Sequence, residues 1–448
     1  MATFIVNGGK KLGGVYEVSG AKNAGPKLII ASMLSDQECV LKNIPRISDT
    51  EKIMQAIREM GGECEWLAPS GLSRAGSRDV EGAGHSVKVN CRNLNNSNVP
   101  DIVLSARHAV LFIGATLARL GHVKINKIGG DKIGKRPIDR LLAGLESIGA
   151  EISEDSDVLE MRMPERPASR DYTFAKNTHT GTESLILASI FNDGKVTIHN
   201  SAQEPEIDNL ITFLNAMGAN VRRNNESERV IEVMGVPKLL GGSTSKSMYD
   251  RLEVATALAL NVMNDGGIEV RNVNSEMVRY FTDALDQIGA SNPSAKYLKP
   301  IILKTSIHPG FITDWQPIMS LLLAYKAQGK SEIHEMIYEQ RWSALQELAK
   351  MGVHYELFQP VGYTVDDFNF NEREFNTNDP YGAYVWGPTE LHGAEVESHD
   401  VRAGITVLIA ALFAKGQSII KDPGNHIDRG YEDIVGKLKK LGADIERI

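Results

Sequence analysis

The chain has 448 residues, of which 42% are hydrophobic and 24% are charged, and its formal net charge is −8. This length exceeds one ordinary hydrophobic core, so two domains are expected. No apolar run reaches the ~18 residues of a membrane span, and the opening residues MATFIVNGGKK lack the pattern of a signal peptide. Because the negative charge also argues against nucleic acid as the main partner, we expect a cytoplasmic protein that binds neither nucleic acid nor membrane.

The three cysteines, Cys39, Cys64 and Cys91, provide neither a disulfide framework nor the spacing of a zinc site. An odd number of cysteines in a large chain is typical of a reducing cytoplasm. We therefore expect no bound metal.

An apolar helix, a short glycine turn and a β-rich strand recur six times along the chain. These segments span residues 28–44, 111–128, 185–200, 257–273, 318–336 and 407–422. A second helix follows each of them and ends at a glycine, namely Gly61, Gly149, Gly218, Gly289, Gly352 or Gly442. Repetition on one plan predicts six structural units.

The first helix of each unit is apolar nearly all round, as in LFIGATLARL (111–120), and this pattern predicts a buried helix. The second helix carries more charge and is expected outside, as in residues 49–62, 136–149 and 433–442. The glycine at its end suits a left-handed C-terminal cap. Each unit should therefore place one helix in a core and one at the surface.

Six units divide into two groups of three, and we expect each group to form a domain. The sixth unit lacks strands for its sheet, and the segments 3–8 and 13–20 are expected to supply them. This arrangement predicts a discontinuous domain of residues 1–21 and 245–448, with a second domain of residues 22–244 inserted into it.

Three segments depart from the repeat. Residues 237–247 are rich in Pro, Gly and Ser, as a hinge between domains would be. Residues 66–86 and 358–390 are long, and loops of such length are usually functional or disordered. We expect both to be peripheral insertions.

Polar and charged residues collect immediately before the six apolar helices. They are Ser19-Gly20-Ala21-Lys22-Asn23, Ser105-Ala106-Arg107, Thr180-Gly181-Thr182-Glu183, Asp250-Arg251-Leu252-Glu253, Thr313-Asp314-Trp315-Gln316 and Asp400-Val401-Arg402. A helix N-terminus has free N–H groups and a partial positive charge. These helix starts are therefore expected to bind an anion.

Two interpretations are open for these residues. Ser105, Thr180 and Thr313 suit simple N-caps. Lys22 and the arginines do not, because cations are disfavoured at a helix N-terminus. They should face an anionic ligand or a neighbouring carboxylate.

The segment Gly129-Gly130-Asp131-Lys132-Ile133-Gly134-Lys135-Arg136-Pro137 is the densest in charge and glycine. Its glycines indicate a mobile loop, and Pro137 suits the first turn of the helix that follows. A loop with three basic residues and a carboxylate can close over an anion and bring a proton donor to it. The alternative is a solvated hairpin between two repeats.

HIDRGYE (426–432) and HPGFITDWQ (308–316) place further charged side chains at expected helix starts. One His without a second ligand at a suitable spacing disfavours a metal site in the first segment, where a structural Asp–Arg pair is the simple alternative. In the second segment, Asp314 is placed to accept a proton from a bound hydroxyl. Its alternative role is again an N-cap.

Six motifs follow one another in a recognisable order: SGAKNA (19–24), GGD-x-I-G-x-RP (129–137), PGF-x-TD (309–314), E-x-R within YEQRW (338–342), D-x-RAG (400–404) and HIDRGYE (426–432). In these motifs the chain resembles the UDP-N-acetylglucosamine 1-carboxyvinyltransferases, the nucleotide-sugar branch of the enolpyruvyl transferase family. The resemblance implies two inside-out α/β domains, each of three ββαβαβ-like repeats.

The resemblance also implies an activity. The enzyme would transfer the enolpyruvyl group of phosphoenolpyruvate to the 3-hydroxyl of UDP-N-acetylglucosamine and release phosphate, the first committed step of peptidoglycan precursor synthesis. An acid and a base suffice for this chemistry, so neither a metal nor another cofactor is expected. Asp131 would be the acid and Asp314 the base.

The resemblance assigns further roles residue by residue. Phosphoenolpyruvate would be held by Lys22, Arg136 and Arg429, with Arg107 and Arg402 adding charge. The sugar would contact Asn23 and Asp314, and the uridine side would contact Arg136, Pro137 and Asp139. Thr180, Gly181 and Ile337 would also bind substrate, supported near the site by Asp49, Glu204, Arg341 and Asp400. The central expectation is a cluster of cations around a compact anion.

Asp131 departs from the commonest pattern, since most of the family has cysteine there and a minority has aspartate. Alkylation by the epoxide antibiotic fosfomycin needs the thiolate, so the resemblance implies fosfomycin resistance. As a proton donor, Asp131 must be neutral when it acts. Because a free Asp has a pKa of about 3.9, closure of the loop must raise that pKa by desolvation.

A second departure concerns the acceptor. The chain has His179-Thr180-Gly181-Thr182-Glu183 where the family usually has S-V-G-A-T beside the nucleotide. Enolpyruvyl transfer to a different uridine nucleotide or sugar therefore stays open, as does a catalytically silent paralogue that binds a nucleotide sugar. The presence of both proton-transfer carboxylates argues against the silent paralogue.

Overall fold

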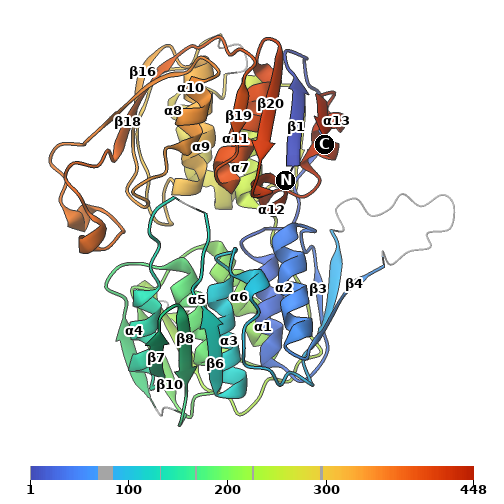
Figure 1. Cartoon of the computed structure of the whole chain (residues 1–448), viewed down its shortest axis with the longest axis vertical. Helices are drawn as coiled ribbons and strands as arrows, with labels where there is room; N and C mark the ends of the chain where they lie inside the picture. The colour runs from blue at the N-terminus through green and yellow to red at the C-terminus, as the bar shows by residue number, and fades with distance from the viewer. Residues whose placement is uncertain (1, 69–83, 132, 167–168, 225–226, 293–295) are drawn as a thin grey trace. The chain divides into compact units, whose positions relative to one another are not determined.

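The computed structural model describes residues 2–68, 84–131, 133–166, 169–224, 227–292 and 296–448 (Figure 1). The chain forms two compact units. Unit 1 comprises Met1–Val18, Lys132–Arg136 and Asp250–Ile448, and unit 2 comprises Ser19–Asp131 and Pro137–Tyr249. No described helix combines the length and the apolar character that a membrane crossing requires.

Unit 2 has three buried helices, which are α1 (Gly25–Ala31), α3 (Ala109–Leu120) and α5 (His179–Ala188). The more charged helices are α2 (Ser48–Glu59), α4 (Asp139–Ser147) and α6 (Pro205–Ala216). Three sheets complete the unit, in the orders β13-β3-β5-β4, β6-β8-β7 and β11-β12-β10-β9.

The strands of unit 2 are short. In the first sheet they are β3 (Cys39–Lys42), β4 (Glu63–Leu67), β5 (Ser86–Asn90) and β13 (Thr244–Lys246). In the second they are β6 (His122–Asn126), β7 (Glu151–Asp155) and β8 (Val158–Arg162). In the third they are β9 (Arg170–Thr173), β10 (Lys195–His199), β11 (Asn220–Asn224) and β12 (Ser227–Met234).

Unit 1 repeats this plan with the buried helices α7 (Arg251–Met263), α9 (Gln316–Lys326) and α11 (Val401–Phe413). The other helices are α8 (Arg279–Gln287), α10 (Ser343–Ala349), α12 (His426–Gly430) and α13 (Ile434–Lys440). Its sheets have the orders β14-β2, β15-β16-β18-β17 and β19-β20-β1-β21.

The strands of unit 1 come from both ends of the chain. The first sheet has β2 (Gly14–Glu17) and β14 (Ile268–Arg271). The second has β15 (Ile302–Lys304), β16 (Gly329–His334), β17 (His354–Phe358) and β18 (Gly382–Gly387). The third has β1 (Ala2–Asn7), β19 (Glu395–Glu397), β20 (Gln417–Asp422) and β21 (Asp444–Arg447).

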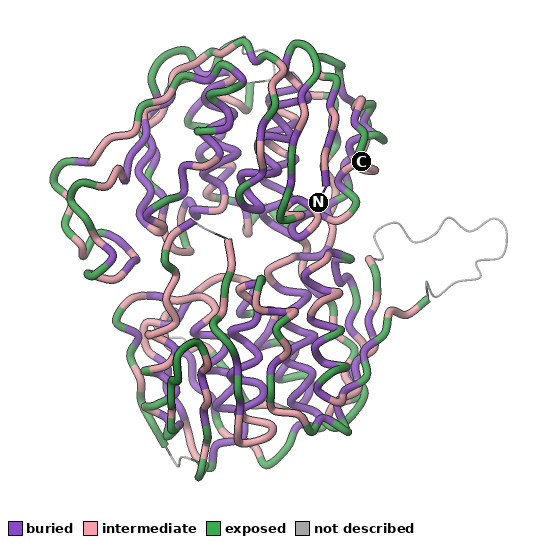
Figure 2. The backbone as a smooth tube through the Cα atoms, viewed as in Figure 1, coloured by how far each residue is buried: buried purple, intermediate pink, exposed green. Residues whose placement is uncertain are grey.

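The apolar helices form the core of each unit, as the sequence predicted. Every residue of α11 from Val401 to Leu412 is buried (Figure 2). In unit 2, α3 and α5 cross so closely that a Cβ on Gly114 would lie 2.0 Å from the carbonyl oxygen of Ser184. The Ser184 hydroxyl accepts from Gly114 N at 3.1 Å and donates to Val110 O at 3.0 Å, so glycine is the residue that permits this crossing.

The glycines that end the outer helices are also as predicted. Their φ angles lie between 82° and 103°, the left-handed region that glycine enters without steric cost. They are Gly61, Gly149, Gly218, Gly289, Gly352 and Gly442. The sixfold repeat is therefore visible in the backbone as well as in the sequence.

The two N-terminal strands were expected to complete the sheet of the sixth unit, and only one does. β1 pairs antiparallel with both β20 and β21, as expected. β2 instead pairs parallel with β14 in the fourth unit, so the expectation for residues 13–20 was wrong. The buried Tyr16 of β2 donates to Glu253 of α7 at 2.9 Å and anchors the strand there.

The segments that interrupt the repeat have different outcomes. Within 237–247, residues 244–246 form β13, which pairs parallel with β3. Residues 358–390 contain β18, a central strand of its sheet, so the expectation of a peripheral insertion was wrong for them. They also contribute to a small aromatic core, formed by Met336, Phe368, Phe370 and Tyr381. Of residues 66–86, positions 69–83 lie outside the described residues.

Candidate active site

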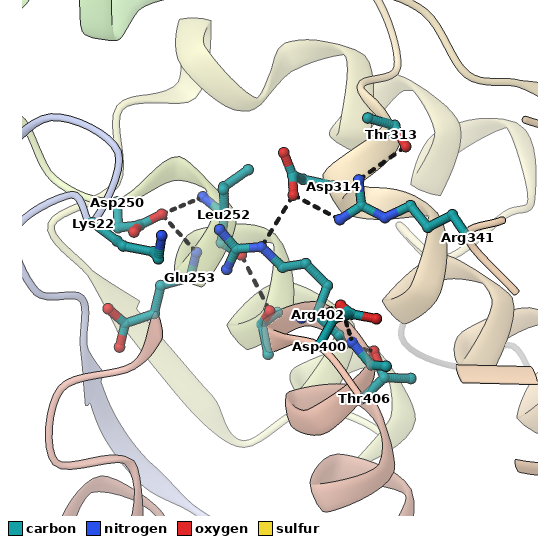
Figure 3. Close-up of polar contacts among 12 residues, drawn as sticks. Lys22, Asp250, Leu252, Glu253, Thr313, Asp314, Arg341, Asp400, Arg402 and Thr406 are labelled. Carbon is teal, nitrogen blue, oxygen red and sulfur yellow. Dashed lines mark hydrogen bonds and ion pairs between the residues drawn. The ribbon is translucent and has the colours of Figure 1, made fainter. Parts of the chain in front are cut away.

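The charged residues of unit 1 gather where its three buried helices begin (Figure 3). Asp250 caps α7, because its carboxylate accepts from Leu252 N at 2.7 Å and Glu253 N at 3.2 Å. Asp400 caps α11 in the same way, accepting from Arg402 N at 2.8 Å and Ala403 N at 3.0 Å. Asp314 lies in the short 3₁₀ helix η4 (Thr313–Trp315) that leads into α9.

Asp314 binds two arginines, and through Arg402 it joins the starts of α9 and α11. Its Oδ1 accepts from Arg341 Nη2 at 2.8 Å and from Arg402 Nε at 3.2 Å. Both arginine side chains are nearly fully buried, whereas the Asp314 side chain is 31% exposed. The carboxylate is thus the accessible end of an otherwise buried charge cluster.

The two arginines determine the charge of Asp314. Burial alone would raise the pKa of this carboxyl, but the positive charges of Arg341 and Arg402 and their hydrogen bonds outweigh burial and lower the pKa well below its usual range. Asp314 is therefore ionised near neutral pH. A carboxylate with such a low pKa is a weak base for as long as both arginines hold it.

Arg402 has a second partner, Tyr431 of the HIDRGYE motif. Arg402 Nη1 donates to the Tyr431 hydroxyl at 3.1 Å, and that hydroxyl lies 3.1 Å from Thr256 Oγ1 in α7. Burial raises the pKa of Tyr431, so the phenol stays protonated. This chain of contacts ties α7, α11 and the C-terminal motif together, and sequence reasoning did not identify Tyr431.

Arg341 has a second partner as well. Its Nη1 donates to Thr313 Oγ1 at 3.0 Å, and Thr313 in turn donates to Glu335 Oε2 at 2.9 Å. Sequence reasoning missed Glu335, although a carboxylate at the end of a β-rich run before YEQRW is an unusual residue to bury.

Residues 132–136 group with unit 1, and the described part of this segment contacts residues 338–340. Lys135 N donates to Glu339 Oε1 at 2.9 Å, and Gln340 N donates to Ile133 O at 3.2 Å. The guanidinium of Arg136 lies 5.4 Å from the ring of Tyr338, and that of Arg341 lies 5.4 Å from the same ring. These contacts exclude the alternative of a merely solvated hairpin.

Arg429 lies in the short helix α12 and is buried. The start of α12 is held by Asp422, which accepts from His426 N at 2.7 Å and Ile427 N at 3.0 Å. Arg429 Nη1 lies 3.4 Å from His426 Nδ1. Asp428 forms an ion pair with Arg447, so the aspartate of this motif has a structural role.

In unit 2, Lys22 pairs with a carboxylate. Its Nζ lies 3.4 Å from Oδ2 of Asp49, which is fully buried at the start of α2. Nδ1 of His108 lies 4.0 Å from the same oxygen. The cations at helix starts were expected to face an anionic ligand or a neighbouring carboxylate, and the structure shows a neighbouring carboxylate for Lys22 and, in unit 1, for Arg402.

The other expected ligand contacts of unit 2 lie at helix starts and in loops. Arg107 Nη2 donates to Pro137 O at 3.1 Å. Asp139 is the first residue of α4, and Thr180 and Gly181 are in the first turn of α5. Asn23 and Asp131 are half-buried, and both lie outside the helices.

The departure at residues 179–183 has a structural counterpart in a buried ionic cluster. Lys27 Nζ lies 2.8 Å from Glu183 Oε2 and 3.0 Å from His179 Nε2. His179 Nδ1 lies 4.0 Å from Glu204 Oε1. Burial and Lys27 each lower the pKa of His179, but the carboxylates of Glu183 and Glu204 outweigh them and raise it. Sequence reasoning did not connect Lys27 with Glu183.

The simple N-cap alternatives were wrong. The N-cap of α3 is His108 and not Ser105, that of α5 is Thr178 and not Thr180, and that of η4 is Ile312 and not Thr313. Asp314 does not cap α9, whose N-cap is Trp315. These polar side chains are therefore left for other roles at the helix starts.

Some of the expected site residues are in contact in the structure, whereas for others it stays a prediction that they lie close together. Asp314, Arg341 and Arg402 are in direct contact in unit 1. Lys22 belongs to unit 2, whereas Arg136 and Arg429 belong to unit 1, so the gathering of these three around one anion stays a prediction. Among the described residues, no group of three or more His, Cys, Asp or Glu side chains is arranged to hold a metal.

Comparison with known proteins identifies the family. Residues 6–438 match the family model of EPSP synthase (3-phosphoshikimate 1-carboxyvinyltransferase). The UDP-N-acetylglucosamine 1-carboxyvinyltransferase of Acidobacterium capsulatum is 33% identical, over 100% of this chain and 96% of the relative. The enzyme of the same name from Bartonella henselae is 32% identical, over the full length of both chains.

Two solved structures share the fold. The enolpyruvyl transferase NikO from Streptomyces tendae has a TM-score of 0.82 at 19% identity, covering 100% of this chain and 98% of NikO. An EPSP synthase from Acinetobacter baumannii has a TM-score of 0.70 at 16% identity, with full coverage of both chains. These matches confirm the expected fold class of two inside-out α/β domains with three repeats each. The chain belongs to the enolpyruvyl transferase family and, within it, to the UDP-N-acetylglucosamine 1-carboxyvinyltransferases.

Proposed function

We propose that this protein transfers the enolpyruvyl group of phosphoenolpyruvate to the 3-hydroxyl of UDP-N-acetylglucosamine and releases phosphate. The observation that carries the proposal is the contact of Asp314 with Arg341 and Arg402. It unites three of the six motifs that define the resemblance, PGF-x-TD, E-x-R and D-x-RAG. The name shared by the relatives at 32–34% identity supports the same acceptor.

The substrates explain the need for cations. Phosphoenolpyruvate carries a carboxylate and a phosphate, and the phosphate alone has a charge of about −1.5 to −2 near neutral pH. Guanidinium groups bind both kinds of anion through paired hydrogen bonds. We assign this task to Lys22, Arg136 and Arg429, with Arg107 and Arg402 adding positive charge.

The reaction needs one proton donor and one proton acceptor. In the addition step, the acceptor hydroxyl attacks C2 of phosphoenolpyruvate, loses its proton to Asp314, and a proton passes from Asp131 to C3. In the elimination step, C3 returns a proton to Asp131, the C2–O bond to phosphate breaks, the enolpyruvyl double bond forms, and the departing phosphate takes the proton from Asp314. Protons and electrons balance over the two steps.

The low pKa of Asp314 suggests how its basicity is controlled. While Arg341 and Arg402 both bind Oδ1, the carboxylate takes up a proton poorly. An anionic substrate that engages Arg402 would weaken the hold of that arginine on Asp314 and raise the pKa, while Arg341 keeps the carboxylate in position. Binding of phosphoenolpyruvate would thus activate the base.

Asp131 in place of cysteine supports resistance to fosfomycin. The only thiols of the chain, Cys39, Cys64 and Cys91, are all buried. Burial raises the pKa of each thiol, and that of Cys91 to about 12, so none is a reactive thiolate near neutral pH. A carboxylate attacks an epoxide poorly. We therefore place the enzyme in peptidoglycan precursor synthesis as a form that the antibiotic does not inactivate.

A test of the acceptor follows from the altered segment at 179–183. Phosphate release from phosphoenolpyruvate would be measured with UDP-N-acetylglucosamine, with UDP-glucose and with 3-phosphoshikimate. We expect turnover with the first at a kcat/KM at least about tenfold above the other two, which corresponds to about 1.4 kcal/mol. A preference for UDP-glucose would replace the acceptor, and phosphate release with none of the three would overturn the proposal.

A further inference from the structure

Glu335 is a carboxylate for which the proposed function has no role. It follows the last residue of β16, and its side chain is fully buried. It belongs to unit 1 and directly precedes the segment 336–341, which carries Ile337 and Arg341. A buried carboxylate is costly unless its oxygens are fully hydrogen-bonded, so its partners indicate why it is there.

Three segments of unit 1 converge on this carboxylate. Oε1 accepts from Thr305 Oγ1 at 3.0 Å, from Ile337 N at 2.9 Å and from Tyr338 N at 3.2 Å. Oε2 accepts from Thr313 Oγ1 at 2.9 Å. Thr305 follows β15, and Thr313 begins η4. One side chain therefore fixes the loop after β16 to the segment that carries Asp314.

Burial raises the pKa of Glu335, against the opposing effect of Arg341 and of its hydrogen bonds, but its hydrogen-bond partners fit an ionised carboxylate. The two backbone N–H groups can only donate. Thr305 Oγ1 already accepts from Met336 N at 2.8 Å, and Thr313 Oγ1 already accepts from Arg341 Nη1 at 3.0 Å, so both hydroxyl protons are available to Glu335. An ionised carboxylate satisfies all four donors, and Arg341 supplies the nearby positive charge.

We propose that Glu335 is the positioning residue that holds Arg341 against Asp314. It acts through Thr313, whose hydroxyl links Glu335 Oε2 to Arg341 Nη1, while Arg341 Nη2 binds Asp314 at 2.8 Å. It also holds the backbone N–H groups of Ile337 and Tyr338, and this backbone leads directly to Arg341. The inference rests on the proposed function for its catalytic consequence but not for its structural one.

A Glu335→Gln variant separates these roles. Its amide oxygen can still accept from the backbone N–H groups, but its NH₂ group faces Thr313 Oγ1 and competes there with Arg341. Arg341 should then loosen its hold on Asp314, and kcat should fall by up to about 100-fold, the cost of misplacing a group by about 1 Å. KM should change less, because the Glu335 side chain is fully buried.

The pH profile distinguishes positioning from general damage. Displacing Arg341 takes away a positive charge that lowers the pKa of Asp314. The acidic limb of the pH profile of kcat should therefore move to higher pH. Removing the negative charge of Glu335 would by itself move the limb to lower pH. An upward shift therefore reports the displaced arginine, whereas a partly unfolded enzyme would lose activity without any shift.

Thr313 provides a conservative series. Thr313→Val removes the hydroxyl that links Glu335 to Arg341 and should also move the acidic limb of the kcat profile to higher pH. Thr313→Ser retains a hydroxyl and should keep the wild-type profile. Glu232→Gln is the matched control, because Glu232 is a buried carboxylate of unit 2 that pairs with Lys195 and Arg222. It should leave the profile unchanged. If Glu335→Gln does not fold, Thr313→Val carries the test.

Hydrogen exchange of the full chain provides a readout that needs no turnover. Amides in 336–342 should exchange faster in Glu335→Gln than in the wild type, with no change in Glu232→Gln. Wild-type protection of 336–342 together with an unshifted acidic limb would overturn the role of Glu335. If the wild type released no phosphate with any acceptor, the proposed function would fail, and the exchange result alone would decide the role of Glu335.

Discussion

Nε of Arg402 lies 3.2 Å from Oδ1 of Asp314, although the two residues are 88 positions apart in the sequence. The contact joins the starts of α11 and α9, two buried helices of the same unit. Cations are unfavourable at helix starts, and this carboxylate compensates for the charge of Arg402. We expect an anionic substrate to rearrange this pair of charges.

Asp314→Asn should abolish most of the turnover, because an amide cannot accept the hydroxyl proton. General-base catalysis contributes about 10²- to 10⁴-fold, and kcat should fall by that amount. The kcat profile reports the pKa in the substrate complex, where phosphoenolpyruvate is proposed to raise that of Asp314. The acidic limb of this profile should therefore also disappear, which steady-state rates from pH 4 to 8 would show. Turnover close to that of the wild type would remove Asp314 from the mechanism.

Asp131→Cys should retain turnover and gain sensitivity to fosfomycin, because it restores the thiolate that opens the epoxide. Asp131→Ala should lose turnover, since it has no proton to donate. Activity would be followed over time after addition of micromolar drug. Rapid, time-dependent inactivation of the wild-type enzyme would contradict the expected resistance, and unimpaired Asp131→Ala kinetics would exclude Asp131 as the acid.

Lys27→Met should destabilise unit 2 by up to about 3–5 kcal/mol, because it breaks a buried ion pair and leaves Glu183 with the imidazole of His179 as its remaining cationic partner. The double variant Lys27→Met/Glu183→Leu should recover most of that loss, since it removes both charges. Urea unfolding followed by a probe in unit 2 would measure the free energies. Equal losses in the single and double variants would show that packing, and not charge, dominates at this position.

His179 should make the stability of unit 2 depend on pH. Its pKa is raised in the folded state, so its contribution is complete below the unfolded pKa of about 6.5 and is lost as pH rises through the folded pKa. The pKa of Glu183 is lowered, burial notwithstanding, by Lys27 and His179. Its contribution is lost only as pH falls through that lowered value, so it does not interfere above pH 6.5.

The matching experiment compares the wild type with His179→Gln. The difference between their free energies of unfolding should decrease as pH rises from 6 to 9. A difference that is constant over this range would show that the imidazolium makes no contribution to stability.

The repeating helices could be predicted from the sequence because their determinants are local. A segment that is apolar nearly all round, such as 111–120, has to be buried wherever it packs. A glycine directly after a helix indicates a left-handed cap at that same residue. The motifs around Asp314 and Arg402 could be found for the same reason, since each one lies within a few residues. The direct contact between Asp314 and Arg402 could not be predicted, because the two residues lie 88 positions apart in the sequence.

What the sequence did not reveal depends on long-range pairing. β2 has only four residues, and nothing within Gly14–Glu17 specifies β14 as its partner. Lys27 and Glu183 each look like ordinary surface charges until the fold joins α1 to α5. The aromatic residues of 358–390 did provide a signal, because side chains such as Phe368 and Tyr381 are rarely abundant in a loop without a core of their own.

The central claim is that this protein forms an enolpyruvyl ether on the 3-hydroxyl of UDP-N-acetylglucosamine. The most direct measurement is to incubate the purified chain with phosphoenolpyruvate and this acceptor, and to identify the nucleotide product by NMR and mass spectrometry. We predict one enolpyruvyl group at the 3-oxygen for each phosphate released. An acceptor recovered unchanged, or modified at any other oxygen, would contradict the account.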